Sequence, residues 1–86
     1  MEFFVYILQC DDGSFYTGYT KNLNQRIRMH MNGKGARYTK SHKPTKVVFI
    51  EKYESRSDAI KRERSIKKKS HNQKKELINT NNFPVN

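Results

Sequence analysis

The sequence predicts a single α+β domain over residues 1–80, in which helices flank a three-stranded β-sheet in the order ββαβαα. Segments 3–8, 14–20 and 47–53 are rich in aromatic and β-branched residues, which favour strands. Between and after them, apolar residues recur at helical spacing behind Asn or Ser caps. A chain of 86 residues buries roughly 60–65% of its unfolded surface, which is enough for one core.

The first two strands are expected to form a hairpin through the sequence DDG at residues 11–13. If all three residues form the loop, with Gly13 in the left-handed conformation, even-numbered residues pair with even-numbered ones. Tyr6 and Tyr16 then share one face of the ribbon. A two-residue loop reverses the parity and places the two phenols on opposite faces. The pairing of the tyrosines therefore depends on the turn.

A helix is expected from Asn22 to about Asn32, where Gly33 ends it. The Asn22 side chain can cap this helix, with Gln25 reaching back from three positions later. Its predicted apolar stripe consists of Leu23, Ile27 and Met31.

The basic, glycine-bearing segment 32–45 is predicted to be a loop. The strand that follows, VVFIEKY at 47–53, begins with a nearly continuous apolar run. Such runs are typical of strands covered on both faces, so we expect this strand to be the most buried of the three.

Ser55 and Asp58 resemble a capping box that opens a second helix, which is expected to run to about Lys69. Counting i+4 and i+7 from Ala59 places Glu63 on the inward stripe, where an apolar residue is expected. Burying an unpaired carboxylate is costly, so Glu63 needs a cation, hydrogen-bond donors or a metal. A salt bridge to an Arg or Lys of this charge-rich helix explains the spacing equally well.

A short third helix is predicted behind Ser70 and Gln73, with Leu77 and Ile78 as its buried residues. Residues 81–86 are expected to form a flexible C-terminal tail, with Phe83 docking on the domain.

The chain carries 18 Lys and Arg against 8 Asp and Glu, a net charge of +10 that indicates a polyanionic partner, most commonly nucleic acid. Its one cysteine excludes an internal disulfide, and the three scattered histidines do not complete a zinc pattern. The longest apolar run, FFVYIL, is far shorter than the ~20 residues of a membrane span, and no signal peptide is visible. These features predict a cytoplasmic protein without a membrane partner.

Four residues of this chain, of three types, match the needs of phosphodiester hydrolysis. That reaction uses a hard divalent cation on a carboxylate, a guanidinium on the phosphoryl oxygens and a base for the attacking water. Glu63 and Arg26 suit the first two roles. Tyr6 or Tyr16 suits the third only if its pKa falls from about 10, which neighbouring cations and a metal favour. The alternative is that each tyrosine is an ordinary strand residue with a packed ring.

These residues carry a resemblance that covers about residues 3–78. VY at 5–6, YTG at 16–18, Arg26 in KNLNQRI and Glu63 in RERSIKK appear in an order that resembles the GIY-YIG nuclease superfamily. With its GKGARYT loop, the sequence is most similar to the small, stand-alone, uncharacterised bacterial members of that superfamily.

The resemblance implies a three-stranded sheet flanked by helices and a single Mg²⁺ or Mn²⁺ held mainly by Glu63. It also implies Arg26 on the scissile phosphate and either Tyr6 or Tyr16 as the general base, with the other phenol holding the water and phosphate network. Two motif positions depart from the family pattern, since Phe4 replaces a glycine and Thr17 replaces an isoleucine.

Further residues extend the expected site. His30, at i,i+4 spacing from Arg26, could assist the leaving group or contact phosphate, although a partly exposed helix histidine is the slightly favoured alternative. The loop is expected to track a phosphate backbone while Tyr38 stacks on an unpaired base; a solvated loop explains the charges equally well. The basic residues of this loop and its borders are Lys34, Arg37, Lys40, Lys43 and Lys46.

Two functions lead from the sequence, ahead of a third, a protein-interaction domain that uses its basic face on an acidic partner. The first is a metal-dependent endonuclease acting on DNA rather than RNA at branched or distorted structures of the kind met in DNA repair, with a protein partner supplying specificity. The second is a basic nucleic-acid-binding module that has the same fold and no catalytic activity. Both predict salt-dependent binding, and they differ in whether Glu63 is needed for cleavage.

Overall fold

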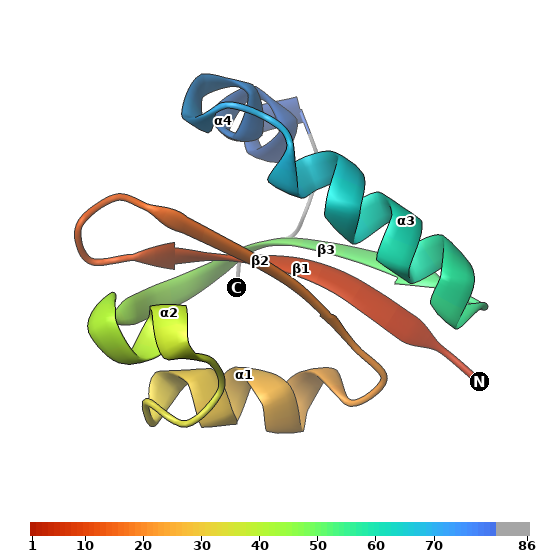
Figure 1. Cartoon of the computed structure of the whole chain (residues 1–86), viewed down its shortest axis with the longest axis horizontal. Helices are drawn as coiled ribbons and strands as arrows, with labels where there is room; N and C mark the ends of the chain where they lie inside the picture. Colours follow the sequence, from red (N-terminus) through yellow and green to blue (C-terminus); the bar gives the residue numbers. More distant parts are fainter. Residues whose placement is uncertain (81–86) are drawn as a thin grey trace.

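A three-stranded antiparallel sheet forms the centre of the computed structural model, which describes residues 1–80 of the chain (Figure 1). The sheet consists of β1 (Phe3–Cys10), β2 (Phe15–Thr20) and β3 (Pro44–Tyr53), in the spatial order β2-β1-β3. The predicted fold class is confirmed. The tail at 81–86, including the docking predicted for Phe83, lies outside the described residues.

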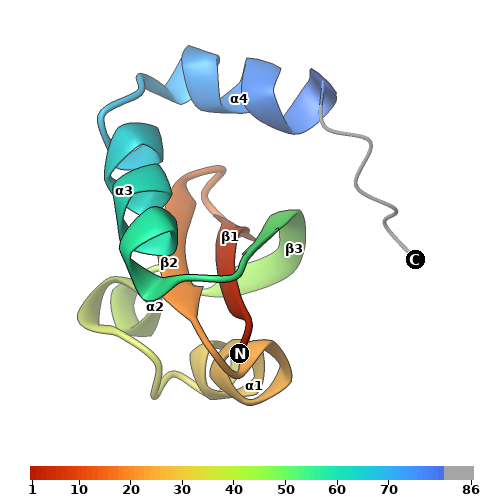
Figure 2. The same cartoon turned by 90° about the vertical axis from the view of Figure 1, so that its right-hand side faces the viewer.

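Helices cover both faces of the sheet (Figures 1 and 2). One face carries α1 (Leu23–Met31) and the short α2 (Arg37–Ser41), and the other carries α3 (Arg56–Lys67) and α4 (His71–Thr80). Within residues 1–80, no helix combines the length and the apolar character that crossing a membrane requires.

The predicted capping residues accept as expected, but Gln25 does not reach back: the Asn22 N–H donates to Thr20 Oγ1 at 3.1 Å instead. Asn22 Oδ1 accepts the Gln25 backbone N–H at 3.2 Å, and Ser55 Oγ accepts that of Asp58 at 3.1 Å. At α4, Gln73 Oε1 accepts the Ser70 N–H at 2.8 Å while the Ser70 Oγ accepts the Gln73 N–H at 3.2 Å. These local hydrogen bonds satisfy backbone donors that have no partner inside the helix, and so they define where each helix begins.

The β1–β2 hairpin has the three-residue loop. Gly13 has a φ of 85°, and the Cys10 N–H donates to the Ser14 carbonyl at 2.8 Å. Even-numbered residues therefore face one another, with Tyr6 opposite Gly18 and Leu8 opposite Tyr16. Since strand side chains alternate between faces, Tyr6 and Tyr16 lie on the same face.

The central strand β1 divides the interior into two parts. Its residues Phe3, Val5 and Ile7 face α3 and belong to the apolar core, which also contains Val48, Phe49, Ala59 and Ile66. Its even-numbered residues point towards α1 and α2, where Tyr6 meets His30. Leu77 and Ile78 of α4 are half-buried against the apolar core.

Strand β3 differs from its prediction. It begins at Pro44 and lies at the edge of the sheet, whereas the most buried strand is β1. An apolar run shows that side chains are covered but not where the strand lies in the sheet. Val48 is the extra residue of a β-bulge, because Ile7 pairs with Phe49 and Leu8 with Val47.

Two further differences lie on the α1–α2 side. Part of the predicted loop forms α2, in which the Lys40 N–H donates to the Ala36 carbonyl at 3.1 Å. This helix is too short to show apolar periodicity. In α1, Met31 is 38% exposed while His30 is fully buried. The predicted apolar stripe is therefore wrong at its last position, because His30 and not Met31 faces the interior. The polar His30 tolerates burial because both ring nitrogens have partners.

Thr17 in β2 allows a test of how much an unsatisfied buried hydroxyl costs in stability. The residue is 3% exposed, and its hydroxyl has no hydrogen-bond partner within residues 1–80. We expect the isosteric Thr17→Val to raise the free energy of unfolding by about 1 kcal/mol, since it removes an unsatisfied group. Urea denaturation measures the change.

The matched control is Thr39→Val. Thr39 is equally buried, at 2% exposed, but its hydroxyl lies 2.9 Å from His30 Nδ1 and 3.2 Å from the Ala36 carbonyl. This variant should lose stability because it leaves partners unpaired. A loss of stability in Thr17→Val as well would contradict the assignment of Thr17 as unsatisfied.

Candidate active site

Three of the predicted site residues form one aromatic cluster on the α1 face of the sheet. The ring centroids of Tyr6 and Tyr16 lie 6.4 Å apart, and the His30 ring lies 5.7 Å from Tyr6 and 4.9 Å from Tyr16. The Tyr6 hydroxyl and His30 Nε2 are 2.7 Å apart in a buried hydrogen bond. The hairpin supplies both tyrosines and α1 supplies the histidine.

Gly18 makes room for this cluster. A Cβ at this position would lie 2.6 Å from the Tyr6 hydroxyl oxygen and 3.2 Å from a ring carbon of Tyr16. Only a residue without a side chain lets both rings lie over the β2 backbone.

His30 is the residue whose burial was predicted incorrectly. The favoured alternative was a partly exposed helix histidine, but His30 is fully buried between Tyr6 and Thr39, with Gly35 against its ring. A Cβ on Gly35 would fall 2.6 Å from His30 Cγ, so the loop backbone lies directly on the imidazole. Contacts with Gly35 and Thr39 of the following segment and with Tyr6 of β1 bury this ring. The helical periodicity of α1 does not record such contacts.

Arg26 lies one turn before His30 on α1 and is half-buried. Its Nη1 lies 3.5 Å from the Gly35 carbonyl, at the limit of a hydrogen bond. Its positive charge acts on both Tyr6 and His30, lowering the pKa of each.

Glu63 lies on α3 with only 15% of its side chain exposed, as the inward position predicts. Its Oε2 forms an ion pair with Lys67 Nζ at 3.4 Å, so the salt-bridge alternative is also present in the structure. No hydrogen bond or ion pair joins Glu63 to Tyr6, Tyr16 or Arg26 in the described part of the chain. Its negative charge nevertheless raises the pKa of Tyr6.

The pKa of Tyr6 moves in the direction opposite to the one that tyrosinate chemistry needs. Burial raises this pKa well above its usual range, and the Tyr16 phenol and the Glu63 carboxylate add to the shift, while Arg26 offsets only part of it. Burial, with Arg26 as the second cause, lowers the pKa of His30. Near pH 7 the free protein therefore holds a protonated phenol against a neutral imidazole.

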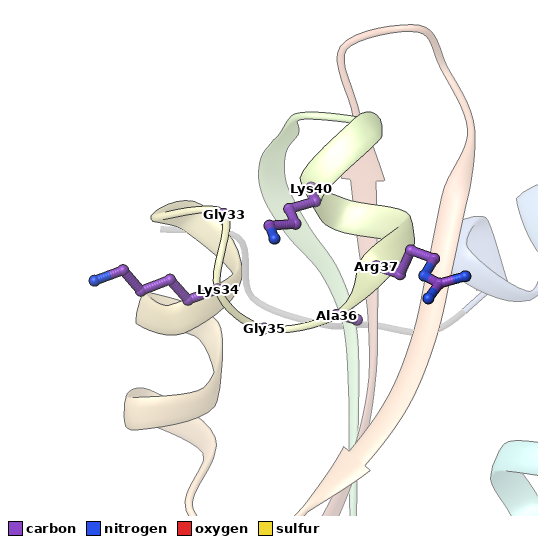
Figure 3. A pocket seen from close by; sticks show the side chains of 6 residues that line it. All are labelled: Gly33, Lys34, Gly35, Ala36, Arg37 and Lys40. Carbon is purple, nitrogen blue, oxygen red and sulfur yellow. The ribbon is translucent and has the colours of Figure 1, made fainter.

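The basic loop borders an open pocket at the end of α1 (Figure 3). Lys34, Arg37 and Lys40 are exposed, and Lys40 reaches from α2 towards the Gly33–Lys34 turn while Arg37 extends away from it. The Tyr38 ring stacks on His42 with centroids 3.9 Å apart, so one of its faces is already covered. The pocket is lined by Gly33, Lys34, Gly35, Ala36, Arg37 and Lys40.

The donor set fits a hard divalent cation and does not fit zinc. Within residues 1–80, no three His, Cys, Asp or Glu side chains gather as a metal cage. Mg²⁺ needs no such cage, because it retains several waters and binds through one or two carboxylates plus substrate phosphates. The largely buried Glu63 supplies one carboxylate of this kind.

Thr39 is the contact that sequence reasoning missed, because it bonds His30 from a segment predicted to be a loop. The salt-bridge partner of Glu63 was predicted only as an Arg or Lys of the same helix, and the structure identifies it as Lys67. The i,i+4 spacing of Glu63 and Lys67 was the available signal for the ion pair. The sequence carries no local signal for Thr39.

Sheet order and helix placement define a compact α+β domain with a tyrosine–histidine cluster on one face of its sheet. The chain belongs to the family described as the GIY-YIG catalytic domain, whose model matches residues 2–77. Membership implies nuclease activity with nucleic acid, most commonly DNA, as the substrate.

Relatives and solved structures agree with this assignment. A UPF0213 protein of Staphylococcus epidermidis is 51% identical over 75 residues, covering 87% of this chain and 92% of the relative, and one of Staphylococcus aureus is 49% identical over the same coverage. The solution structure of a UPF0213 protein from Bacillus halodurans matches with a TM-score of 0.64 at 39% identity, covering 98% of this chain and 89% of that one. A protein of E. faecalis matches with a TM-score of 0.65 at 36% identity, covering 100% and 92%.

The approach of Tyr6 to Gly18 can be tested with a double-mutant cycle. Gly18→Ala should destabilise the protein by about 1–3 kcal/mol, because the new methyl overlaps the Tyr6 hydroxyl. In a Tyr6→Phe background the same change should cost less, since the nearest atom is gone. Urea denaturation of the four proteins gives the coupling, and equal costs in both backgrounds would mean that the Tyr6 hydroxyl is not part of the overlap.

The buried His30 should make stability pH-dependent. Its pKa is lowered in the folded state, so below about pH 6.5 the unfolded chain binds a proton that the folded chain does not. Stability should therefore fall as the pH drops through 6.5 towards the lower folded pKa. His30→Gln should flatten this part of the profile, and His71→Gln, at an exposed position, serves as the control. Identical profiles for wild type and His30→Gln would contradict the expectation.

Proposed function

We propose that this chain is a metal-dependent endonuclease that hydrolyses phosphodiester bonds in DNA, selecting branched, flapped or distorted structures. The observation that carries the proposal is the buried hydrogen bond between the Tyr6 hydroxyl and His30 Nε2, in a cluster with Tyr16. Arg26 and Glu63 supply opposite charges that act on the same phenol.

Tyr6 is the phenol better suited to act as the general base. Its raised pKa keeps it protonated, so it can take a proton from the attacking water only while it passes its own proton on. His30 Nε2, 2.7 Å away, is positioned to receive that proton. Tyr16 has no such acceptor among its contacts, and it serves to orient the water and the phosphate.

Arg26 and Glu63 act on the phosphate. The Arg26 guanidinium, fixed beside the cluster, stabilises negative charge that develops on the phosphoryl oxygens. A single Mg²⁺ or Mn²⁺, when bound to Glu63, would neutralise part of the same charge. Lys67 compensates the Glu63 carboxylate in the free chain and has to give up this contact when a metal binds.

The basic loop supports binding of nucleic acid without recognition of its base sequence. Lys34, Arg37 and Lys40 are exposed around one pocket, and contacts from such side chains to phosphates fix position but carry no sequence information. We therefore propose recognition of DNA shape by this domain in the cytoplasm, with any sequence specificity supplied by a protein partner.

Cleavage of labelled single-stranded, duplex, flap and four-way-junction DNAs with Mg²⁺ or Mn²⁺ tests the proposal. Glu63→Gln and Arg26→Ala should each reduce cleavage by about 10²-fold or more, the effect of removing a group that stabilises transition-state charge. The matched controls are Glu54→Gln and Arg28→Ala, which make the same changes at exposed positions. These controls should keep near wild-type rates.

Other outcomes would contradict the proposal. Cleavage that survives both site substitutions would mean a contaminant or a different site. Salt-dependent binding of every DNA without cleavage would favour the basic binding module, in which Glu63 and Lys67 form only a structural ion pair.

A further inference from the structure

We propose that Thr39 is a positioning residue of this site: its hydroxyl holds His30 in the tautomer with the proton on Nδ1, which leaves Nε2 free to accept from Tyr6. The inference deepens the proposed function and rests on it for its catalytic consequence. The tautomer itself can be tested without any substrate.

The contacts form one continuous buried chain. His30 Nε2 lies 2.7 Å from the Tyr6 hydroxyl, and His30 Nδ1 lies 2.9 Å from Thr39 Oγ1. Thr39 Oγ1 in turn lies 3.2 Å from the carbonyl of Ala36. The side chains of His30 and Thr39 are both buried, so these polar atoms depend on one another for partners.

The number of available protons determines which group donates in each of these hydrogen bonds. A neutral imidazole has one N–H, and each hydroxyl has one proton. If Thr39 donates to the Ala36 carbonyl, Nδ1–H donates to Thr39 and Tyr6 donates to Nε2, and all three protons are bonded. The Ala36 carbonyl also accepts the Lys40 N–H at 3.1 Å, which its second lone pair allows.

The opposite assignment of donors and acceptors leaves more polar groups without a hydrogen-bond partner. If Thr39 donates to Nδ1, the ring proton on Nε2 points at Tyr6, and the Tyr6 proton has no acceptor among the described residues. The oxygens of Thr39 and Ala36 would then face each other at 3.2 Å without a proton between them. Leaving a buried donor unsatisfied is costly, so the first arrangement is favoured.

The surroundings hold the ring in place. Gly35 lies against the imidazole so closely that even a Cβ would overlap it. The ring therefore cannot rotate without moving the loop. The hydrogen-bond partner of each ring nitrogen then determines whether that nitrogen carries the proton.

The tautomer matters for the proton path. As the water oxygen bonds to phosphorus and the leaving oxygen departs, the water proton moves to the Tyr6 oxygen and the Tyr6 proton moves to His30 Nε2. His30 becomes a cation that still donates from Nδ1 to Thr39. The proton returns through Tyr6 to solvent, and solvent protonates the leaving oxygen. A ring already protonated at Nε2 could not accept the proton.

Nitrogen-15 NMR of the histidine rings in the wild-type protein, Thr39→Val and Thr39→Ser tests the assignment. At pH 8, His30 of the wild type should show a protonated Nδ1 and an unprotonated Nε2. Thr39→Ser keeps the hydroxyl and should keep this pattern. Thr39→Val removes the acceptor of Nδ1–H, so each tautomer then leaves one buried donor unsatisfied, and the clear preference for the proton on Nδ1 should be lost.

Cleavage assays on the same proteins give the second readout. Thr39→Val should cut on the order of 10²-fold more slowly, within the range that general acid–base catalysis contributes, while Thr39→Ser should stay near wild type. Circular dichroism checks that each variant is folded. If Thr39→Val fails to fold, the wild-type and Thr39→Ser spectra still decide the tautomer.

The outcomes separate this inference from the proposed function. A wild-type ring protonated at Nε2, or a Thr39→Val protein with unchanged tautomer and rate, would overturn the role of Thr39. The expected tautomer in a protein that cuts no DNA would support the positioning contact and overturn the nuclease proposal.

Discussion

The register of the β1–β2 hairpin is the constraint on which the other features depend. Because the loop has three residues, the odd-numbered side chains of β1 enter the apolar core while Tyr6 and Tyr16 share the opposite face. Gly18, opposite Tyr6, leaves the space in which the two rings meet. A shift of one residue would place phenols in the core and apolar groups in the site. The apolar core and the tyrosine–histidine cluster thus lie on opposite faces of one strand.

Burial keeps the groups at the centre of the cluster uncharged, although the protein as a whole is strongly basic. The chain carries a net charge of +10, yet the groups at the centre of the cluster are an un-ionised phenol and a neutral imidazole. Desolvation outweighs the nearby guanidinium of Arg26 in setting the pKa of Tyr6. In the free protein Tyr6 therefore keeps its proton and donates it in a hydrogen bond to His30.

Local features of this fold were predictable from the sequence and distant contacts were not. The caps at Asn22 and Ser55 are hydrogen bonds between near neighbours, so their spacing identified them. The inward position of Glu63 followed from helical periodicity. The edge position of β3 and the burial of His30 depend on contacts between different elements, which no periodic pattern records, and α2 is too short to show a period.

The basic loop, α2 included, is held to the domain by side chains of the site itself. His30 bonds Thr39, Arg26 reaches the Gly35 carbonyl, and Tyr16 stacks on the Tyr38 ring. The exposed cations of this loop therefore project from a backbone that is already ordered. When they meet a polyanion, the conformational entropy lost is mainly that of their own side chains, and less of the binding free energy is spent on fixing the chain.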